Sequence, residues 1–268
     1  MLRVWWSREP SPGNFGDILT PHILHHFGIA HRWADQGQCD AISTGSIIRF
    51  ATDGMDVLGS GAIDTSDRIN PGAKFHWVRG PLTGEKVRKS GGVCPEVYGD
   101  PALLLPQIFP RTVEPDQELG VFVHYVDFAR CKYPFVINPL GDPLTILRSL
   151  WRCKRVVSSS LHGIIAAHAY GIPAAWARFS TQLAGDGIKF HDHARSVGLA
   201  EMPLSTVEEP DFTLPVRVDN IASVLNAFSE RLRSPQRRRL RPRACPVAGK
   251  AGSRSGVSVR RAGARGRY

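Results

Sequence analysis

The chain has 268 residues, 42% of them hydrophobic, which is enough to bury a core in one large domain or in two domains of roughly 100 to 150 residues. Its apolar runs fall well short of the roughly 20 residues that cross a bilayer, and the N-terminal residues lack the apolar stretch of a signal peptide, so the sequence predicts a folded cytoplasmic protein. Five widely spaced cysteines without a CxxC pair predict reduced thiols rather than disulfides or a zinc site.

The charge of the chain is unevenly distributed. The net charge is +10, but residues 231–268 hold 13 of the 34 lysines and arginines and no acidic residue, which leaves the remainder slightly acidic. This Arg-rich tail is dense in Pro, Gly and Ser and is predicted to be disordered. Three interpretations stay open: contact with an anionic membrane, a nucleic-acid arm, or an extension without a role. The body, neither basic nor rich in aligned aromatics, argues against a nucleic-acid partner.

The first half of the chain alternates short apolar runs with loops and helical patterns. An apolar run at 2–6 ends in a Pro/Gly loop and leads into 15–28, where apolar residues recur at roughly helical spacing. Further apolar runs start at 41, 56 and 74. The last leads through Arg79 into a predicted helix that begins at Pro81, because proline fits the first helical position. Strand, loop and helix in this order indicate a parallel sheet.

A Pro-rich and charged stretch at 107–118 separates this half from a second one. The same pattern then returns, with apolar runs that begin at 119, 134 and 155, a predicted helix at 142–152 and a last one at 219–232. We therefore expect an α/β protein with two Rossmann-like, doubly wound domains at 1–112 and 118–230, and a ligand site in the cleft between them. No sequence repeat is visible, which argues against solenoids and propellers.

The stretch "VVSSSLHG" at 156–163 reads as a buried strand that breaks into serines and enters a helix with His162 in its first turn. Ligands gather at the carboxyl ends of parallel strands, where helix N-termini favour anions. Ser160 is a candidate helix cap, and Gly163 leaves room for backbone or ligand to approach. Two interpretations of His162 stay open: a bound anion sets its protonation, or the residue only caps and packs the start of the helix.

Two further loops offer polar groups. The Arg79 guanidinium and the helix N-terminus that follows can share one anion, although arginines also end strands for solubility. In "PGNFGD", Asn14 and Asp17 offer a helix cap or contacts to hydroxyls. Neither this loop nor the glycines at 59 and 61 match a dinucleotide or P-loop fingerprint.

A last polar cluster lies in "GDGIKFHDHARSVGL" at 185–199, with Lys189, His191, Asp192 and His193 close in sequence. His191, Asp192 and His193 follow one another directly, which is a poor spacing for a metal on one helix face, where an i, i+4 pair is needed. The spacing favours an exposed polar loop, and no metal site is predicted.

Taken together, the ordered stretches "NFGD" at 14, "VRGPLTGEKVRKSG" at 78, "YGDPALLLP" at 98, "SSSLHGIIAAHAYGIPAAW" at 158 and "KFHD" at 189 resemble the polysaccharide pyruvyl transferase family. The resemblance implies a GT-B-like fold and transfer of pyruvate from phosphoenolpyruvate to a sugar of an exopolysaccharide or its precursor, as a ketal. The acceptor is expected to be free or lipid-linked. The expected location is the cytoplasm, or its membrane face if the basic tail contacts anionic lipid. No metal or redox cofactor is required.

Carried over to this sequence, the resemblance makes His162 the catalytic histidine, with Asp17 as a candidate base. The implied substrate-binding residues are Asn14, Gly16, Arg79, Ser160, Gly163, Arg178 and Lys189. Many members have an arginine before the Leu-His-Gly motif, where this chain has Ser160, so another cation must hold the phosphate. Two other functions stay open: a GT-B glycosyltransferase that uses a nucleotide sugar, and a sugar-binding protein without catalysis.

Overall fold

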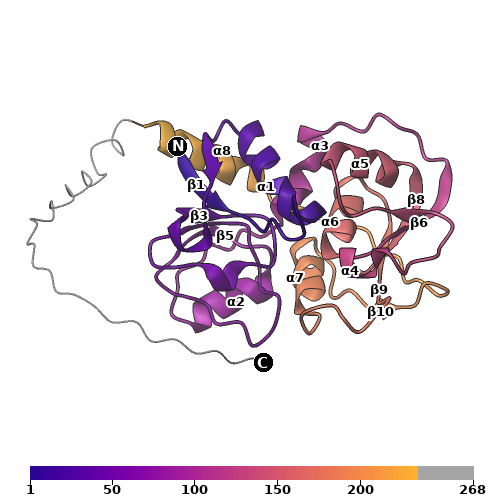
Figure 1. Cartoon of the computed structure of the whole chain (residues 1–268). Helices are drawn as coiled ribbons and strands as arrows, with labels where there is room; N and C mark the ends of the chain where they lie inside the picture. The colour runs from indigo at the N-terminus through magenta and orange to yellow at the C-terminus, as the bar shows by residue number, and fades with distance from the viewer. Residues whose placement is uncertain (235–268) are drawn as a thin grey trace, which may run out of the picture. The chain divides into compact units, whose positions relative to one another are not determined.

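A computed structural model of the chain describes residues 1–234 (Figure 1). Met1–Arg233 forms one compact unit with two five-stranded sheets, and this confirms the expected α/β class. The first sheet contains β1 (Leu2–Trp5), β2 (His31–Trp33), β3 (Ala41–Ile42), β4 (Asp56–Leu58) and β5 (Lys74–Trp77). The second contains β6 (Gln117–Phe122), β7 (Val136–Ile137), β8 (Cys153–Ser158), β9 (Ala174–Ala177) and β10 (Leu204–Ser205).

Both sheets have the same strand order. The strands run β2-β1-β3-β4-β5 in the first sheet and β7-β6-β8-β9-β10 in the second, and the neighbouring strands are parallel. In each sheet, the order in which successive strands are added therefore reverses beside the first strand. This switch point lies between β1 and β3 in the first sheet and between β6 and β8 in the second. Loops at the carboxyl ends of strands that flank such a switch point form the usual ligand crevice of parallel sheets.

The helices follow the sequence pattern closely. They are α1 (Phe15–His26), α2 (Pro81–Lys89), α3 (Leu105–Ile108), α4 (Tyr125–Phe128), α5 (Pro143–Trp151), α6 (Leu161–Ala169), α7 (Ile188–Ser196) and α8 (Ile221–Arg233), with 3₁₀ turns η1 (Gln36–Gln38), η2 (Ile48–Phe50) and η3 (Pro101–Leu104). The helices expected at 142–152 and 219–232 are confirmed as α5 and α8. Helix α2 begins at Pro81 as predicted.

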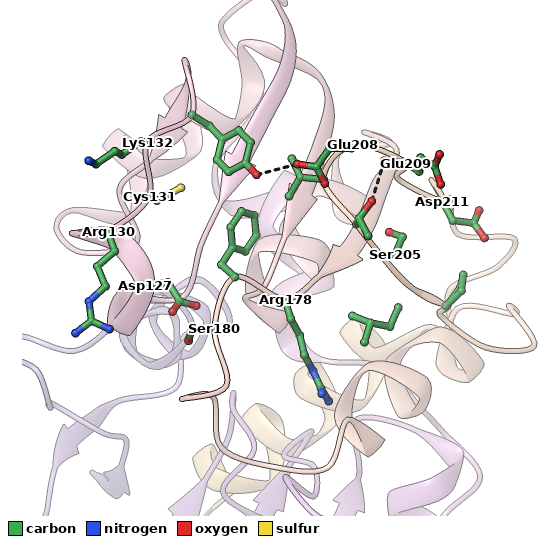
Figure 2. Close-up of a pocket in the computed structure, with 16 residues that line it drawn as sticks. Asp127, Arg130, Cys131, Lys132, Arg178, Ser180, Ser205, Glu208, Glu209 and Asp211 are labelled. Atoms are coloured by element: carbon green, nitrogen blue, oxygen red, sulfur yellow. Dashed lines mark hydrogen bonds between the residues drawn. The ribbon is translucent and has the colours of Figure 1, made fainter.

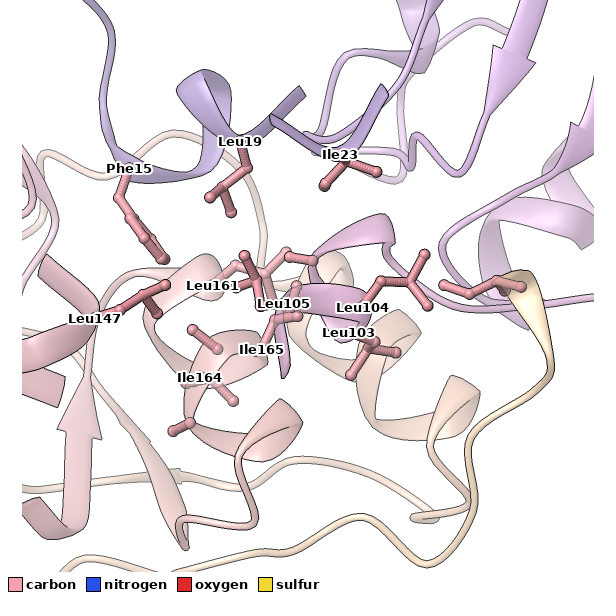
Figure 3. Close-up of a cluster of buried hydrophobic side chains, with 14 of the residues drawn as sticks. Phe15, Leu19, Ile23, Leu103, Leu104, Leu105, Leu147, Leu161, Ile164 and Ile165 are labelled. Atoms are coloured by element: carbon pink, nitrogen blue, oxygen red, sulfur yellow. The ribbon is translucent and has the colours of Figure 1, made fainter. Parts of the chain in front are cut away.

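One apolar cluster joins elements of both halves (Figure 3). Helix α1 presents Phe15, Leu19 and Ile23 at four-residue spacing, which places them on one helix face. These side chains pack in the same cluster as Leu105 of α3 and Leu161 of α6. Because α1 follows β1 and α6 follows β8, this packing fixes the loops at the two switch points relative to each other.

The polar stretch at 185–199 is a helix and not the exposed loop that the sequence favours. In α7, the side chains of Lys189, Asp192 and His193 are buried. Asp192 forms an ion pair with Arg79, in which the guanidinium nitrogens Nε and Nη2 lie 3.1 Å from Oδ2, and neither side chain has exposed surface. The spacing of residues in the sequence does not reveal that Asp192 is buried. Its partner Arg79, which compensates the buried negative charge, lies 113 residues away.

Asp192 also caps helix α2. The N-cap residue of α2 is Gly80, which has no side chain to accept a hydrogen bond. The Asp192 carboxylate instead accepts hydrogen bonds from the backbone N–H of Thr83, at 2.9 Å, and from the Thr83 hydroxyl, at 2.6 Å. A carboxylate at a helix N-terminus is favourable, because it satisfies a free N–H and opposes the positive end of the helix dipole.

Helix α8 returns to the first half of the chain. The ring of Phe228 lies against His76 of β5, with 4.8 Å between ring centroids, and the Asp219 carboxylate accepts a hydrogen bond from the backbone N–H of Tyr98 at 2.9 Å. The domain limits 1–112 and 118–230 stay a prediction. Helix α8 belongs to the second half of the sequence, but it contacts the sheet of the first half. It also continues through Arg233, past the predicted start of the tail.

The predicted disordered tail otherwise falls on residues 235–268, outside the residues that the structure describes. Among the described residues, no helix combines the length and the apolar character that a membrane crossing requires.

We predict that Asp192→Ala lowers the free energy of unfolding by about 3 to 5 kcal/mol, because it leaves the buried Arg79 charge without its partner. Urea unfolding measures the change. The matched control is Arg195→Ala, which removes an exposed charge from the same helix and should change the free energy by less than about 0.5 kcal/mol. Equal stability of the two variants would contradict the assigned role of Asp192.

Candidate active site

The N-terminus of α1 lies against the second half of the chain. The backbone N–H of Phe15 donates a hydrogen bond to the carbonyl of Pro139 at 2.9 Å, and Asn14 forms an antiparallel bridge with Leu140. The loop after β1 therefore meets the region of β7, next to the switch point of the second sheet. The loop that holds Asn14 is thereby fixed to the second half of the chain.

Asn14 caps α1 and holds Asp17. Its side-chain oxygen accepts a hydrogen bond from the backbone N–H of Gly16 at 3.2 Å, and its amide nitrogen donates to the Asp17 carboxylate. Burial raises the pKa of Asp17 to about 6, while the neighbouring His162 and the hydrogen bonds of Asn14 act in the opposite direction. A carboxyl with this pKa can both hold and release a proton near neutral pH.

His162 lies in the first turn of α6, as the sequence predicts, and only 9% of the residue is exposed. The glycine at 16 is needed for this placement, because a Cβ there would lie 2.1 Å from His162 Nδ1. The imidazole thus sits directly against the start of α1. The two residues predicted to be catalytic, His162 and Asp17, are neighbours in the folded chain.

Asp100 completes this group and was not singled out from the sequence. Its Oδ2 lies 3.6 Å from His162 Nε2, and both atoms are buried without a hydrogen-bond partner in the described chain. Its Oδ1 accepts from the backbone N–H of Ala102 at 2.9 Å, so Asp100 is the N-cap of η3. The dipeptide Asp100-Pro101 inside the quoted motif, a typical helix start, is the signal that could have found it.

The serines before His162 organise the loop rather than cap the helix. Ser158 Oγ donates to the carbonyl of Phe122 at 2.6 Å and to that of Ser160 at 2.9 Å. Ser160 is the N-cap residue of α6, but its side chain makes no capping hydrogen bond. A Cβ at Gly163 would lie 2.5 Å from Ser158 Oγ and 2.7 Å from the Phe122 ring. Gly163 therefore permits close packing of α6 on the sheet, and its predicted contact with substrate stays a prediction.

Lys189 is a buried cation with few polar partners for its positive charge. Its Nζ makes one long hydrogen bond, 3.4 Å, to the carbonyl of Ala184, and only 9% of the residue is exposed. Burial, together with the charges of Arg79 and Arg178, lowers the pKa of Lys189 to about 8. A buried ammonium flanked by like charges is well suited to an anion. Arg178, exposed at the end of β9, forms no ion pair within residues 1–234 that the structure gives.

His124 is a second residue that sequence analysis missed. It follows β6, at the other side of the switch point from Ser158–Ser160, and its backbone N–H donates to Ser159 Oγ at 2.9 Å. Burial lowers the pKa of His124 to about 4, and Lys189 and His162 lower it as well, whereas Asp127 raises it. Its Nδ1 is buried and has no hydrogen-bond partner among the described residues. No sequence pattern marks this histidine, because its proximity to His162 depends on the strand order.

Arg79, predicted to bind substrate, has no exposed surface. Besides its ion pair with Asp192, it donates from Nη1 to Ser46 Oγ at 2.7 Å and from Nη2 to the carbonyl of Ala62 at 2.5 Å. These partners give Arg79 a clear structural role in fixing α7. Direct contact with a substrate would require some of them to separate, so that predicted role stays a prediction.

A pocket of about 1140 Å³ lies in the second half of the chain (Figure 2). Its lining comes from the segments 127–133 and 178–180, which follow β6 and β9, and from 203–211, which contains β10. All of them belong to the second half, so this pocket is not a cleft between the two expected domains. The Asp127 and Arg178 side chains line it. Within the described residues, no group of three or more His, Cys, Asp or Glu side chains is placed to hold a metal ion.

The fold and the cluster define an α/β protein whose candidate active site joins a histidine and two carboxylates to nearby lysine and arginine side chains. The chain belongs to the polysaccharide pyruvyl transferase family, because the sequence model of that family matches residues 13–177. This confirms the resemblance read from the motifs. The matched segment includes Asp17, Asp100 and His162 and ends just before Arg178.

Two curated relatives match part of the chain. An uncharacterized protein of Acanthamoeba polyphaga mimivirus, L143, is 34% identical over 58% of this chain and 59% of its own length. The succinoglycan biosynthesis protein ExoV of Rhizobium meliloti is 31% identical over 47% of this chain and 41% of its own length. The chain thus matches about two fifths to three fifths of the length of these relatives. A crystal structure of an uncharacterized protein from Klebsiella pneumoniae has a TM-score of 0.49 at 15% identity, over 77% of this chain and 93% of its own.

We predict that Asp17→Asn gains stability relative to the wild type as the pH rises. The pKa of Asp17 in the folded protein, about 6, lies above the ordinary value of 3.8, so the stability linked to its proton is complete below pH 3.8 and is lost as the pH rises through 6. Asparagine does not ionise, and the difference between variant and wild type should grow by about 2 to 3 kcal/mol between pH 4 and pH 8.

Urea unfolding at the two pH values measures this difference. Asp53→Asn, which removes an exposed carboxylate far along the chain, is the matched control. A stability difference for Asp17→Asn that stays constant with pH would show that burial does not raise this pKa.

Proposed function

We propose that the protein transfers pyruvate from phosphoenolpyruvate to a sugar of an exopolysaccharide or its precursor and forms a pyruvate ketal. The observation that carries the proposal is the proximity of His162 to both Asp17 and Asp100. The buried cation Lys189 and His162 both act on the same residue, His124. Membership in the polysaccharide pyruvyl transferase family supports the reaction. The name of ExoV, a succinoglycan biosynthesis protein, supports a polysaccharide acceptor.

The reaction makes two carbon–oxygen bonds to one carbon and releases phosphate. A proton adds to the methylene carbon of the donor, one sugar hydroxyl bonds to the neighbouring carbon, and a second hydroxyl replaces the phosphate at that carbon. We assign the proton donation to His162, because its imidazole is the acid–base group nearest to both carboxylates. Asp17, with a pKa near 6, then accepts a hydroxyl proton as the ketal closes.

Asp100 acts as a positioning residue in this scheme. Its Oδ2 faces His162 Nε2 at 3.6 Å, and its other oxygen is fixed by the η3 cap. A buried carboxylate in this position orients the imidazole. Asn14 and Gly16 also position the catalytic groups, from the start of α1. Asn14 holds the Asp17 carboxylate, and Gly16 leaves space for the His162 ring.

Lys189 and Arg178 are the cations that we assign to the donor. Phosphoenolpyruvate carries a carboxylate and a phosphate, and both need positive charge in a site with little water. Arg79 is occupied by Asp192, Ser46 and Ala62, whereas Lys189 has a single long hydrogen bond. Lys189 and Arg178 thereby take the place of the arginine that many members have where this chain has Ser160.

The finer features of the resemblance are part of this proposal. They are a GT-B-like relation of the two sheets and an acceptor that is free or lipid-linked. Contact with an anionic membrane through the basic tail, and with it the inner-face location, concerns residues outside the described chain.

The decisive experiment incubates the protein with phosphoenolpyruvate and a panel of soluble and lipid-linked glycosides. Release of phosphate together with acid-labile pyruvate on the sugar supports the proposal. Consumption of a nucleotide sugar without use of phosphoenolpyruvate would make the protein a glycosyltransferase. Saccharide binding without turnover of either donor would make it a sugar-binding protein.

We predict that His162→Ala lowers kcat for pyruvyl transfer by about 100-fold or more, the loss expected when a general acid is removed. Circular dichroism verifies that the variant is folded. His25→Ala removes an exposed histidine from α1 and is the matched control, with kcat expected to stay within about twofold. Phosphate release by His162→Ala near the wild-type rate would refute the assignment.

We predict that the KM for phosphoenolpyruvate rises as the pH increases above about 8. Lys189, with its pKa lowered to about 8 by burial, is charged below that pH and neutral above it. In Lys189→Arg the cation persists at every pH tested, so the rise in KM should disappear. In Lys189→Met the KM should be high throughout.

Initial rates at pH 7, 8 and 9 provide the three KM values for each protein. Lys74→Met, which removes an exposed lysine from β5, is the matched control and should follow the wild type. The same pH dependence in wild type and Lys189→Arg would remove Lys189 from the donor site.

A further inference from the structure

Apart from Arg178, the lining of the pocket beside β6, β9 and β10 is not used by the donor chemistry. Figure 2 places Arg130 and Lys132 on one side and Glu208, Glu209 and Asp211 on the other. With Asp127 and Arg178 included, the pocket has slightly more acidic than basic side chains. Such a surface disfavours the multiply charged phosphoenolpyruvate, because its carboxylates repel an anion.

Aromatic rings and hydroxyl groups make up another part of the same lining. Tyr133 and Phe179 meet edge to face, with 5.7 Å between ring centroids, and the Tyr133 hydroxyl donates to Glu208 Oε1 at 3.4 Å. Ser205 and Thr206 supply further hydroxyls. Ligand pockets commonly combine an apolar surface with a few oriented polar groups. Here the polar groups are carboxylates and hydroxyls, which match the donors and acceptors of a sugar.

Asp127 gives a separate indication of a ligand. The residue is only 4% exposed, and its Oδ2 is buried without a hydrogen-bond partner among the described residues. A buried carboxylate oxygen that lacks a donor is costly unless a ligand or water supplies one. Because Asp127 lines the pocket, a hydroxyl group of a bound molecule can supply that donor.

The pocket lies beside the elements that carry the proposed donor site. Asp127 belongs to α4, whose N-cap residue is His124, and Arg178 follows β9, in which Trp176 pairs with Ser158 of β8. Arg178 lines the pocket and is close enough to Lys189 to influence its ionisation, and Asp127 has the same relation to His124. His124 in turn interacts with both Lys189 and His162. A molecule in the pocket can therefore extend a hydroxyl group toward the cluster around His162.

We propose that this pocket is the acceptor subsite and that it binds a neutral oligosaccharide, with Tyr133 and Phe179 against the sugar rings and Asp127 bonded to a hydroxyl group. The proposal rests on the proposed function, since it names where the sugar of that reaction lies. A volume of about 1140 Å³ is at the upper end of ligand pockets, so more than one sugar ring fits. Specificity for the acceptor then depends on the segments 127–133 and 203–211.

The test uses the variants Phe179→Ala, Tyr133→Ala and Asp127→Asn in the full chain, with soluble neutral tetrasaccharides of glucose, galactose or mannose as probes. The matched control is Phe50→Ala, which removes a partly buried ring that packs on Trp5 in the first half. Saturation-transfer NMR measures binding of each tetrasaccharide without phosphoenolpyruvate, and initial rates give KM for both substrates.

We expect the wild type and Phe50→Ala to show saturation transfer to at least one tetrasaccharide, and each pocket variant to lose most of it. The KM for the acceptor should rise about tenfold, the loss expected for one aromatic contact, with the KM for phosphoenolpyruvate within about twofold. A rise in the KM for phosphoenolpyruvate instead would assign the pocket to the donor. Unchanged binding in all three variants would overturn the proposal.

The two proposals fail in different ways. If the wild type binds a tetrasaccharide through the pocket but transfers no pyruvate to any glycoside, the proposed function fails and the saccharide subsite stands. If the wild type transfers pyruvate while all pocket variants keep the wild-type acceptor KM, the subsite fails and the proposed function stands.

Discussion

The buried ion pair between Arg79 and Asp192 is the constraint on which the candidate site depends. Arg79 comes from the end of β5 and Asp192 from α7, so the pair ties the first half of the chain to the helix that carries Lys189. The same carboxylate caps α2 in place of the side chain that Gly80 lacks. A single acidic residue thus satisfies a guanidinium, a hydroxyl and a helix N-terminus, and all three fix the position of α7.

Burial brings the pKa values of two groups of the candidate site, Asp17 and Lys189, closer to neutral pH. Burial raises the pKa of Asp17 to about 6 and lowers that of Lys189 to about 8. Both shifts have the same cause, since a low-dielectric environment disfavours whichever form is charged. The Asp17 carboxyl can exchange protons near neutral pH, and a bound anion stabilises the charged form of Lys189. Both properties suit a reaction in which an acidic donor binds and phosphate is released.

The sequence predicted the class of fold, the start of α2, the approximate positions of α5 and α8, and the position of His162, because each depends on local periodicity or on a cap or proline at a helix start. It could not predict Asp100 or His124 as neighbours of His162, since their proximity follows from strand order and not from spacing along the chain. The prediction of an exposed loop at α7 was wrong, because no residue near Asp192 in the sequence indicates that Asp192 pairs with Arg79. Arg79 was recognised as notable, but only the structure revealed how many internal partners it has.

The shared strand order gives the molecule an internal pseudo-symmetry that no repeat in the sequence reveals. Under it, β1 corresponds to β6 and β3 to β8, so the loop of Asn14 is equivalent to that of His124, and Ser43–Ser46 is equivalent to Ser159–His162. Each of the latter loops holds a serine that accepts a hydrogen bond, Ser46 from the Arg79 guanidinium and Ser159 from the backbone N–H of His124. In relatives too divergent to align by motif, equivalent residues can therefore be located by strand position, in either half.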